Sequence, residues 1–542
     1  MKKLLTDRLT GLVFLLLLGA GAAQAQAPTW QWAVSVGEGE TEATAVDATG
    51  NVVVTGSFLG TIAFGSFQLT SVGSYDVFVA KFTPMGNCLW AVQGGGSDDD
   101  HGYNLAVDSG GNVYVTGKYH GLATFGNTTL STGNFANVVV AKLSAAGVWQ
   151  WAASADAGTT ARGMGVALDG GGNVYVTGGF SSPTARFGST TLTRSPTYVN
   201  GFVARLSPAG SWQWATQISG SNGGGYIRSD TAGNLYMAGH FLSSTATFGT
   251  ITLSISGGNC FVAKLNASTG AWQWSINGGG SSGGLGRGLG LDNGGNVYVT
   301  GSFRGSTATF GSTTLTGTGD LNLFVARMSP AGTWQWAVGA TGAGPNNQER
   351  SNLSTDTSGN IYVAGSFNSD QITVGTTTLF NAVPGSSVAD AFVAKLTPAG
   401  TWQWALRVGG PGYEGCTGVV ADQTNIYVCG SYNSPVIAFG TTTLSYAGNS
   451  TAGFIAGLRA PAVGVARETT AALLCLSPNP AHETVQLTGA PGPTATLLDA
   501  LGRTVRTVPL TAGAATLDVA DLTAGLYIVR AGSATRRLVV ER

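Results

Sequence analysis

The amino-acid sequence predicts an all-β protein, from its composition and from the rhythm of its apolar residues. Glycine supplies 84 of the 542 residues, and hydrophobic residues make up 43% of the chain. Short apolar runs alternate with Gly/Asn and Pro/Gly segments, which is the pattern of short strands joined by tight turns. Neither a helical protein nor a disordered one has this pattern.

The charge of the chain excludes one class of function. Charged residues make up 10% of the chain and the formal net charge is -1. A protein that binds nucleic acid or an anionic membrane surface through its overall charge needs a basic surface. We therefore expect no nucleic-acid partner.

The N-terminus has the features of an export signal. Lys2, Lys3 and Arg8 precede an apolar run over Gly11–Ala23, and Ala23-Gln-Ala25 has the small-x-small pattern of a cleavage site. Residues 1–25 are therefore expected to be a signal peptide. This apolar run is short for a membrane span and no later stretch reaches that length, so we expect no transmembrane segment in the mature chain.

Internal repeats organise the next 430 or so residues. Four short patterns each recur seven times: Gly-Asn-x-Tyr-x-x-Gly, Phe-Val-Ala-Lys/Arg, Phe-Gly and Trp-Gln-Trp, with a few degraded copies. All 13 tryptophans fall in the last pattern. Each repeat contains two hairpins, for example Val166–Leu168 with Val174–Thr177 and Phe202–Leu206 with Trp212–Ala215. Four strands repeated seven times predict a seven-bladed β-propeller over residues 26–459.

The phase of the repeat predicts how such a ring closes. The chain begins with a fourth strand, Trp30–Val34, and its repeats end with a third strand, Phe454–Leu458. Pairing these two strands would complete the seventh blade and remove two exposed sheet edges. In these repeats the chain resembles the secreted bacterial β-propeller repeat family, which implies a fold and no fixed activity.

A different segment follows the repeats. Residues 460–470 form a predicted linker, and residues 471–542 contain short strand-like runs punctuated by Gly and Pro, as in a small Ig-like β-sandwich. This segment resembles the C-terminal sorting domain of type IX secretion cargo in four motifs that occur in the family's order. The residues that carry the resemblance are Pro478, Asn479, Pro480, Gly502, Gly525, Tyr527, Arg536 and Arg537.

This resemblance implies a partner and a location. The partner is the type IX secretion machinery, and the location is the medium or the outer-membrane surface of a Gram-negative bacterium, reached through the periplasm. An ordinary adhesive sandwich domain is the alternative.

Three sets of residues are candidates for binding. Asp98, Asp99 and Asp100 form an acidic cluster that could hold a cation, although adjacent residues usually point apart and are solvated. An Asp opens the first-hairpin turn of every repeat, where capping of the turn accounts for it. The paired tryptophans could stack on sugars, but their presence in every repeat favours packing between blades.

Local motifs do not predict an enzyme. The four histidines share no repeat position, and neither a His-Glu-x-x-His motif nor a phosphate-binding glycine loop is present. No cofactor is expected. Of the five cysteines, Cys416 and Cys429 are near enough in the repeat to raise the question of a disulfide, and we expect small buried thiols.

The sequence thus favours an exported, non-catalytic binding module for a glycan or a protein ligand. A structural or adhesive component of the cell envelope is the first alternative. A propeller hydrolase or lyase is the second, because propeller enzymes assemble their sites from several blades.

Overall fold

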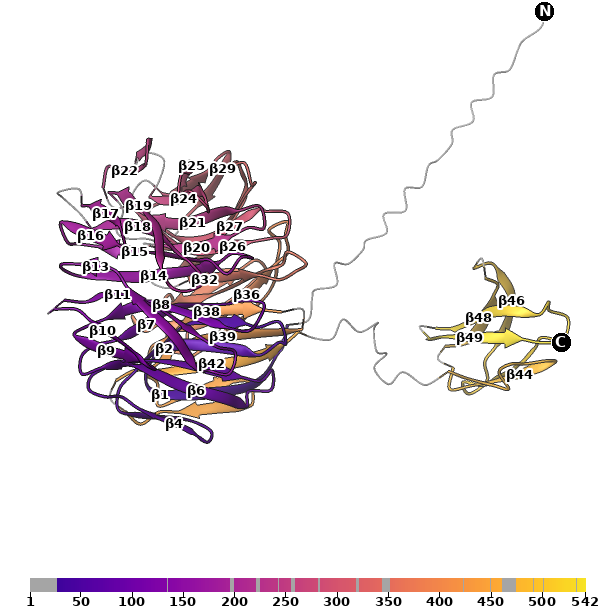
Figure 1. Ribbon diagram of the computed structural model, residues 1–542. Coiled ribbons are helices and arrows are strands. Elements are labelled where there is room, and N and C mark those ends of the chain that lie inside the picture. Colours follow the sequence, from indigo (N-terminus) through magenta and orange to yellow (C-terminus); the bar gives the residue numbers. More distant parts are fainter. Residues whose placement is uncertain are drawn as a thin grey trace, which may run out of the picture. The chain divides into compact units, whose positions relative to one another are not determined.

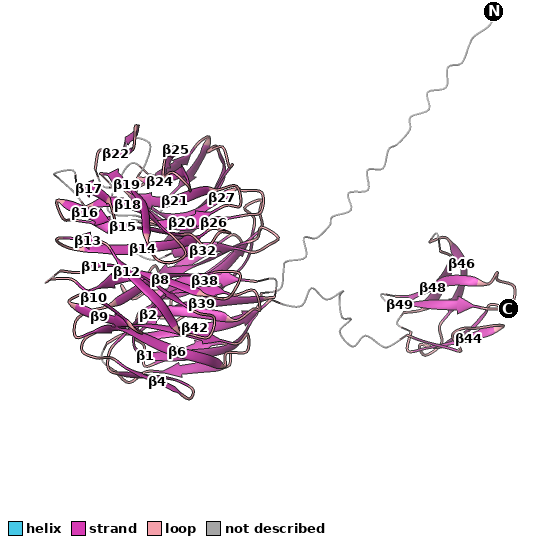
Figure 2. Ribbon diagram, in the orientation of Figure 1, coloured by secondary structure: helices cyan, strands magenta, loops and turns pink. Residues whose placement is uncertain are grey.

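The computed structural model describes residues 27–460 and 474–542, apart from residues 134, 195–198, 221–224, 242, 255–258, 281–282, 318–320, 344–350, 423, 449, 491, 501 and 533. The predicted signal peptide, and the predicted linker beyond Ala460, lie outside the described residues. The chain divides into two compact units, Met1–Pro461 and Ala462–Arg542. All regular secondary structure that the structure describes is β-strand (Figure 2), which confirms the predicted all-β class.

In the first unit, one order of four antiparallel strands recurs in every sequence repeat (Figure 1). The first strands of the repeats are the second half of β1 (Thr29–Val46), β7 (His101–Val107), β14 (Ala161–Leu168), β20 (Tyr226–Ser229), β26 (Gly284–Leu291), β32 (Ser351–Thr355) and β38 (Glu414–Ala421). The second strands are β2 (Val52–Phe58), β8 (Val113–Tyr119), β15 (Val174–Phe180), β21 (Asn234–His240), β27 (Val297–Phe303), β33 (Ile361–Phe367) and β39 (Asn425–Tyr432). The third strands are β5 (Asp76–Phe82), β11 (Asn137–Leu143), β18 (Asn200–Leu206), β24 (Cys260–Asn266), β30 (Asn322–Met328), β36 (Asp390–Leu396) and β42 (Ala452–Arg459). The fourth strands are β6 (Cys88–Gly96), β12 (Trp149–Ser154), β19 (Trp212–Ser219), β25 (Trp272–Gly278), β31 (Trp334–Ala343), β37 (Trp402–Val408) and the first half of β1.

The prediction of two hairpins per repeat is wrong, because each repeat also contains a third one. It lies between the second and third strands and is closed by the Phe-Gly pattern, whose glycine has a positive φ, as at Gly126 (62°). These hairpins are β3 (Thr61–Phe64) with β4 (Phe67–Thr70), β9 (Leu122–Phe125) with β10 (Thr128–Ser131), β16 (Thr184–Phe187) with β17 (Thr190–Thr193), β22 (Thr245–Phe248) with β23 (Ile251–Ser254), β28 (Thr307–Phe310) with β29 (Thr313–Thr316), β34 (Gln371–Val374) with β35 (Thr377–Phe380), and β40 (Val436–Phe439) with β41 (Thr442–Ser445). A two-residue strand, β13 (Asp156–Ala157), pairs with β16.

Strand β1 takes part in both the first and the last repeat. Its second half pairs with β2, from Gly39 opposite Phe58 to Val46 opposite Val52. Its first half pairs with β42, with Trp30 opposite Leu458 and Val34 opposite Ile455. The first strands contact one another in chain order, and β38 of the last repeat contacts β1.

The core lies between neighbouring repeats. Strands β2 and β5 are buried along their whole length, because both faces of each sheet are covered. One apolar cluster joins Tyr362 and Ala364 of the sixth repeat to Val428 and Phe454 of the seventh. The repeats therefore pack face to face.

The Trp-Gln-Trp segments join neighbouring repeats, as the packing hypothesis requires. Trp149 Nε1 donates to the carbonyl of Gln93 in the preceding repeat (2.9 Å), and Trp151 Nε1 donates to that of Pro208 in the next one (3.1 Å). The Trp149 ring also stands edge-on to Phe125 of the Phe-Gly pattern, with centroids 5.2 Å apart. These contacts confirm a structural role for the tryptophans.

Burial decides how much each tryptophan contributes. Trp404 is 6% exposed, whereas Trp212 and Trp214 are only half-buried. A cost of about 3–5 kcal/mol is typical of a fully buried Trp→Ala change, so it applies to Trp404→Ala and not to Trp212→Ala. Denaturant unfolding of both variants measures the difference, and equal losses of stability would contradict this assignment.

The second unit has two antiparallel sheets with a shared core. One sheet contains β43 (Cys475–Ser477), β44 (Thr484–Thr488) and β47 (Ala515–Asp518). The other has the order β46-β45-β48-β49, from β46 (Thr504–Pro509), β45 (Thr494–Leu498), β48 (Gly525–Ala531) and β49 (Ala534–Val540). Val485, Leu517, Val529 and Leu538 are among the buried residues between them. The strands lie close to where the sequence predicts them, and the largest difference is at β49, which begins at Ala534 where the sequence predicts Arg537.

Candidate functional site

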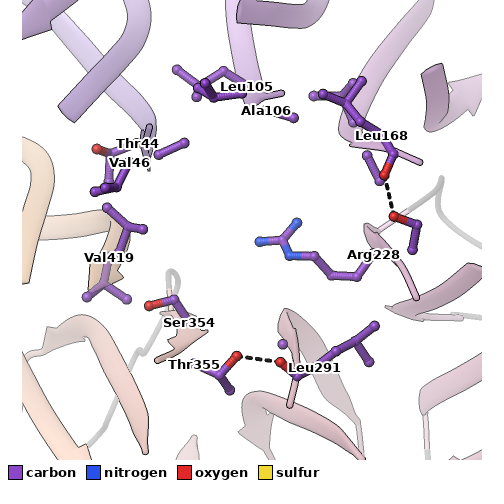
Figure 3. A pocket seen from close by; sticks show the side chains of 17 residues that line it. Thr44, Val46, Leu105, Ala106, Leu168, Arg228, Leu291, Ser354, Thr355 and Val419 are labelled. Carbon is purple, nitrogen blue, oxygen red and sulfur yellow. Dashed lines mark hydrogen bonds between the residues drawn. The ribbon is translucent and has the colours of Figure 1, made fainter. Parts of the chain in front are cut away.

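A pocket of about 410 Å³ lies among the first strands of the repeats, and every one of the seven contributes lining residues (Figure 3). Its size falls within the range of sites for small ligands. Most of its wall is apolar or carries short hydroxyl side chains, for example Val46, Leu105 and Thr355. Thr355 Oγ1 donates to the carbonyl of Leu291 (2.6 Å) and thereby ties two neighbouring first strands together at the wall.

Arg228 is the one charged side chain among the described residues that line this pocket, and it points into the open centre (Figure 3). In its strand pair, Arg228 faces Tyr236. The residues at the equivalent position of the other repeats are all small or apolar: Ala45, Ala106, Ala167, Gly290, Ser354 and Val420. Arg228 is therefore the one large, charged residue at a position that carries a small or apolar residue in every other repeat.

The charge of Arg228 has no internal counterion. Its Nη1 donates to the carbonyl of Ile227 (2.9 Å), and no carboxylate of the described residues forms an ion pair with it. Burial lowers the pKa of the guanidinium, but arginine starts so high that it stays protonated. An unpaired guanidinium in a pocket favours an anionic ligand, because it can pair with a carboxylate, sulfate or phosphate through two parallel hydrogen bonds.

The repeated turn aspartates cap their own turns, as the sequence predicts. Asp169 Oδ1 accepts hydrogen bonds from the backbone N–H groups of Gly171 (2.9 Å) and Asn173 (3.0 Å). Its Oδ2 accepts from Asn173 Nδ2 (2.8 Å) and from the Tyr175 hydroxyl (2.7 Å). Each of the other aspartates accepts the same two backbone bonds, from the second residue after it and from the turn Asn: Asp47, Asp108, Asp230, Asp292, Asp356 and Asp422.

The acidic cluster is split between surface and interior. Asp98 lies 3.6 Å from His120 Nδ1, and Asp99 is exposed and accepts a hydrogen bond from Ser74, which lowers its pKa. Both line a surface pocket of about 300 Å³. Asp100 is fully buried instead. Within the described ranges, no three His, Cys, Asp or Glu side chains come together as a metal-binding group, so the three neighbours do not form one site.

The cysteines are free thiols, including Cys416 and Cys429, which are buried. Burial raises the pKa of the Cys429 thiol to about 12, which makes it a poor nucleophile. Burial also lowers the pKa of His101 and His240 to about 4. None of these groups has the environment of an activated catalytic residue.

The residues of the sorting motif are spread over several elements of the second unit. Asn479 joins the last strand by donating through Nδ2 to the carbonyl of Arg537 (2.8 Å) and accepting from Val539 N (2.9 Å). The Tyr527 hydroxyl donates to the carbonyl of Thr523 (2.9 Å), and Arg536 Nε donates to that of Leu474 (3.1 Å).

The two glycines of this motif lie at strand boundaries. Gly502 holds φ at 80° in the turn opened by Asp499, and Gly525 begins β48 opposite Val540. Arg536 and Arg537 are consecutive residues of β49, and both are exposed. No helix long and apolar enough to span a membrane occurs in the part of the chain that the structure describes.

Comparison with known proteins matches both parts of the chain. Residues 476–541 match the secretion system C-terminal sorting domain, and residues 89–118 match a beta-propeller repeat. An uncharacterized WD repeat-containing protein, L264, of Acanthamoeba polyphaga mimivirus is 24% identical over 459 residues, which cover 69% of this chain. The match spans 32% of that relative, so the chain corresponds to about a third of its length.

Two solved structures are partly similar to this chain. The Pan2 WD40 domain of Neurospora crassa has a TM-score of 0.37 at 9% identity, and the similarity covers 79% of this chain and 95% of that one. The endosialidase of phage phi92 has a TM-score of 0.37 at 11% identity, covering 94% and 79% respectively. Such distant similarities carry no information about ligands. Taken with the sequence matches, the recurring four-strand order and the separate C-terminal sandwich identify the chain as a β-propeller repeat protein that carries a C-terminal sorting domain of the type IX secretion system.

Proposed function

We propose that the chain forms a ring of seven blades that is exported and serves as a non-catalytic binding module for a glycan or protein ligand. The dual pairing of β1 and the contact of β38 with β1 support a ring closed by the N-terminal strand. The sorting domain implies secretion or display at the cell surface. We propose the outer-membrane surface or the medium as the destination, after a signal peptide over residues 1–25 has brought the chain into the periplasm.

The observation that carries the binding proposal is the unpaired guanidinium of Arg228 in the central pocket. Arg228 is partly buried and points into the open pocket, so an anionic ligand that enters the pocket can pair with it. The ligand we propose is an acidic saccharide or an acidic side chain of a protein, whose carboxylate or sulfate reaches Arg228. A structural or adhesive envelope component has no need of such a charge, and a hydrolase or lyase needs acid–base groups that this pocket does not present among its described lining residues.

The test is binding of the exported protein to an array of uronic-acid and sulfated glycans beside neutral ones, and to acidic peptides. Arg228→Ala is expected to weaken the binding of acidic ligands by about 10–100-fold, which is the usual contribution of a hydrogen bond to a charged group. The variant should fold, because Ala45, Ala106 and Ala167 hold the equivalent position.

The matched control is Arg304→Ala, which removes the same charge from an exposed residue outside the pocket. It should bind like the parent protein. Equal binding by Arg228→Ala and the parent would refute the pocket around Arg228 as the site, and binding of neutral glycans alone would refute the anionic ligand.

A further inference from the structure

Two pairs of carboxylates are buried where neighbouring repeats meet. Asp76 and Asp100 lie where the first repeat meets the second, which we call the first junction. Asp390 and Glu414 lie where the sixth repeat meets the seventh, which we call the sixth junction. All four residues are completely inaccessible to solvent.

The two junctions are built alike. Asp76 and Asp390 begin the third strand of their repeats, opposite Phe58 and Phe367 at the ends of the second strands. The backbone N–H of Asp100 donates to the carbonyl of Tyr75, the residue before Asp76 (2.6 Å). The backbone N–H of Glu414 donates to the carbonyl of Ala389, the residue before Asp390 (2.7 Å). The same position at the start of the third strand carries Asn in three other repeats: Asn137, Asn200 and Asn322.

At the first junction, backbone N–H groups donate hydrogen bonds to both carboxylates. Asp100 Oδ2 accepts from Gly96 N (2.7 Å) and its Oδ1 accepts from His120 N (3.0 Å). Asp76 Oδ2 accepts from Val72 N (3.1 Å). Hydrogen bonds donated to a carboxylate favour its charged state.

One oxygen of the pair has no hydrogen-bond partner and lies near the other carboxylate. Asp76 Oδ1 is buried and makes no hydrogen bond. A Cβ built on Gly95 would stand 2.5 Å from Asp76 Oδ1 and 2.8 Å from Asp100 Oδ2, so these two oxygens flank one point beside the glycine. A buried carboxylate oxygen without a partner is costly, and here it faces a second negative charge.

The sixth junction has a positive charge that the first one lacks, although Asp390 Oδ1 is also buried there without a hydrogen bond. There, Arg407 Nη1 donates to the carbonyl of Phe380 (2.9 Å) and to Asp390 Oδ2 (3.0 Å). Gln93 takes the equivalent place at the first junction, opposite Phe78 as Arg407 is opposite Phe392. It donates to the carbonyl of Thr70 (2.7 Å) and to Asp76 Oδ2 (3.3 Å), but it is neutral.

The first junction is therefore short of one positive charge. Among the described residues, no lysine or arginine forms an ion pair with Asp76 or Asp100. Burial raises the pKa of Asp76 to about 6 and that of Asp100 to about 7, and it raises the pKa of Asp390 and Glu414 at the sixth junction as well.

We propose that the first junction binds a divalent cation of the calcium class between Asp76 Oδ1 and Asp100 Oδ2. Both donors are hard oxygens, which suit calcium, and backbone carbonyls or water would supply its further ligands. An exported protein meets enough calcium to fill a site with a dissociation constant on the order of 10⁻⁴–10⁻³ M. The cation would tie the first repeat to the second, as Arg407 supplies the positive charge at the sixth junction.

The test is titration of the full exported chain with calcium chloride at pH 8, by calorimetry and by thermal unfolding. We expect one calcium per chain with a dissociation constant on the order of 10⁻⁴–10⁻³ M. Relative to chelator, saturating calcium should raise the melting temperature by about 2 °C. Asp76→Asn should weaken calcium binding at least tenfold, and it should fold because Asn is the residue of other repeats at this position.

Two further variants make the test specific. Asp390→Asn makes the same change at the sixth junction and should leave calcium binding intact. Gln93→Arg copies the sixth junction and should both raise the melting temperature in chelator and abolish the calcium response. Calcium binding that survives Asp76→Asn and Gln93→Arg would overturn the proposal. So would no binding at about 10 mM calcium, which would mean that the carboxylates share a proton instead.

Discussion

Deletion of residues 26–36 from the mature chain is expected to lower the melting temperature more than any single substitution in the first unit. These residues include most of the half of β1 that pairs with β42. Their loss uncovers the edge of β42 and removes two tryptophans. Trp32 is 9% exposed and donates through Nε1 to the carbonyl of Pro84 (2.9 Å), and Trp30 stands edge-on to Phe439 at 4.9 Å.

The expected size of this effect follows from those contacts. Loss of a buried tryptophan alone costs about 3–5 kcal/mol, a large part of the 5–15 kcal/mol that typically stabilises a domain. The uncovered edge should also make the protein aggregate. Calorimetry and light scattering measure both effects. The control is Gln31→Ala, because Gln31 is exposed and, among the described residues, its side chain forms hydrogen bonds only with Thr29 and Trp30. A deletion no more harmful than Gln31→Ala would contradict the role given to β1.

A chain that ends at Pro461 is expected to fold but to stay in the periplasm. The second unit has its own core, formed by residues such as Val485 and Leu538, and residues 476–541 match the sorting domain. The first unit should therefore not need it to fold. Fractionation of the cells followed by immunoblotting gives the location. Truncated protein found in the medium or on the surface would contradict the export role of the tail.

The reciprocal experiment asks whether the tail is sufficient. Residues 462–542 fused to an unrelated protein with a signal peptide should carry that protein out of a host that has type IX secretion. The matched control is the same fusion with Arg536 and Arg537 changed to Ala. These two side chains are exposed on β49, so their loss should spare the fold and can report contact with the machinery. A parent fusion that stays in the periplasm would leave the tail as an ordinary sandwich domain.

The repeats made most of the fold predictable from the sequence. Side chains that alternate between the faces of a strand leave a pattern of period two, and seven copies of that pattern reinforce one another. The additional hairpin of each repeat was less visible, because its strands are only four residues long and one face is exposed, as in β9. Its Phe-Gly turn was recognisable as a repeat and not as a turn between two further strands.

The candidate sites depend on contacts between residues that are far apart in the sequence. Asp100 is next to Asp98 and Asp99 in the sequence. In the structure, however, the carboxylate near it is that of Asp76, which begins β5. Arg228 could have been found by aligning the repeats, since the equivalent residues are small or apolar. What such an alignment could not show is that all seven of these positions face one pocket.

Ring closure is the claim on which the rest depends, because only a closed ring brings all seven first strands around Arg228. An experimental structure of the exported chain at a resolution that shows side chains tests it most directly. We expect seven blades, with residues 29–38 as the outermost strand of the last blade and Trp30 opposite Leu458. Six or eight blades, or a first half of β1 that lies in the first blade, would contradict the account.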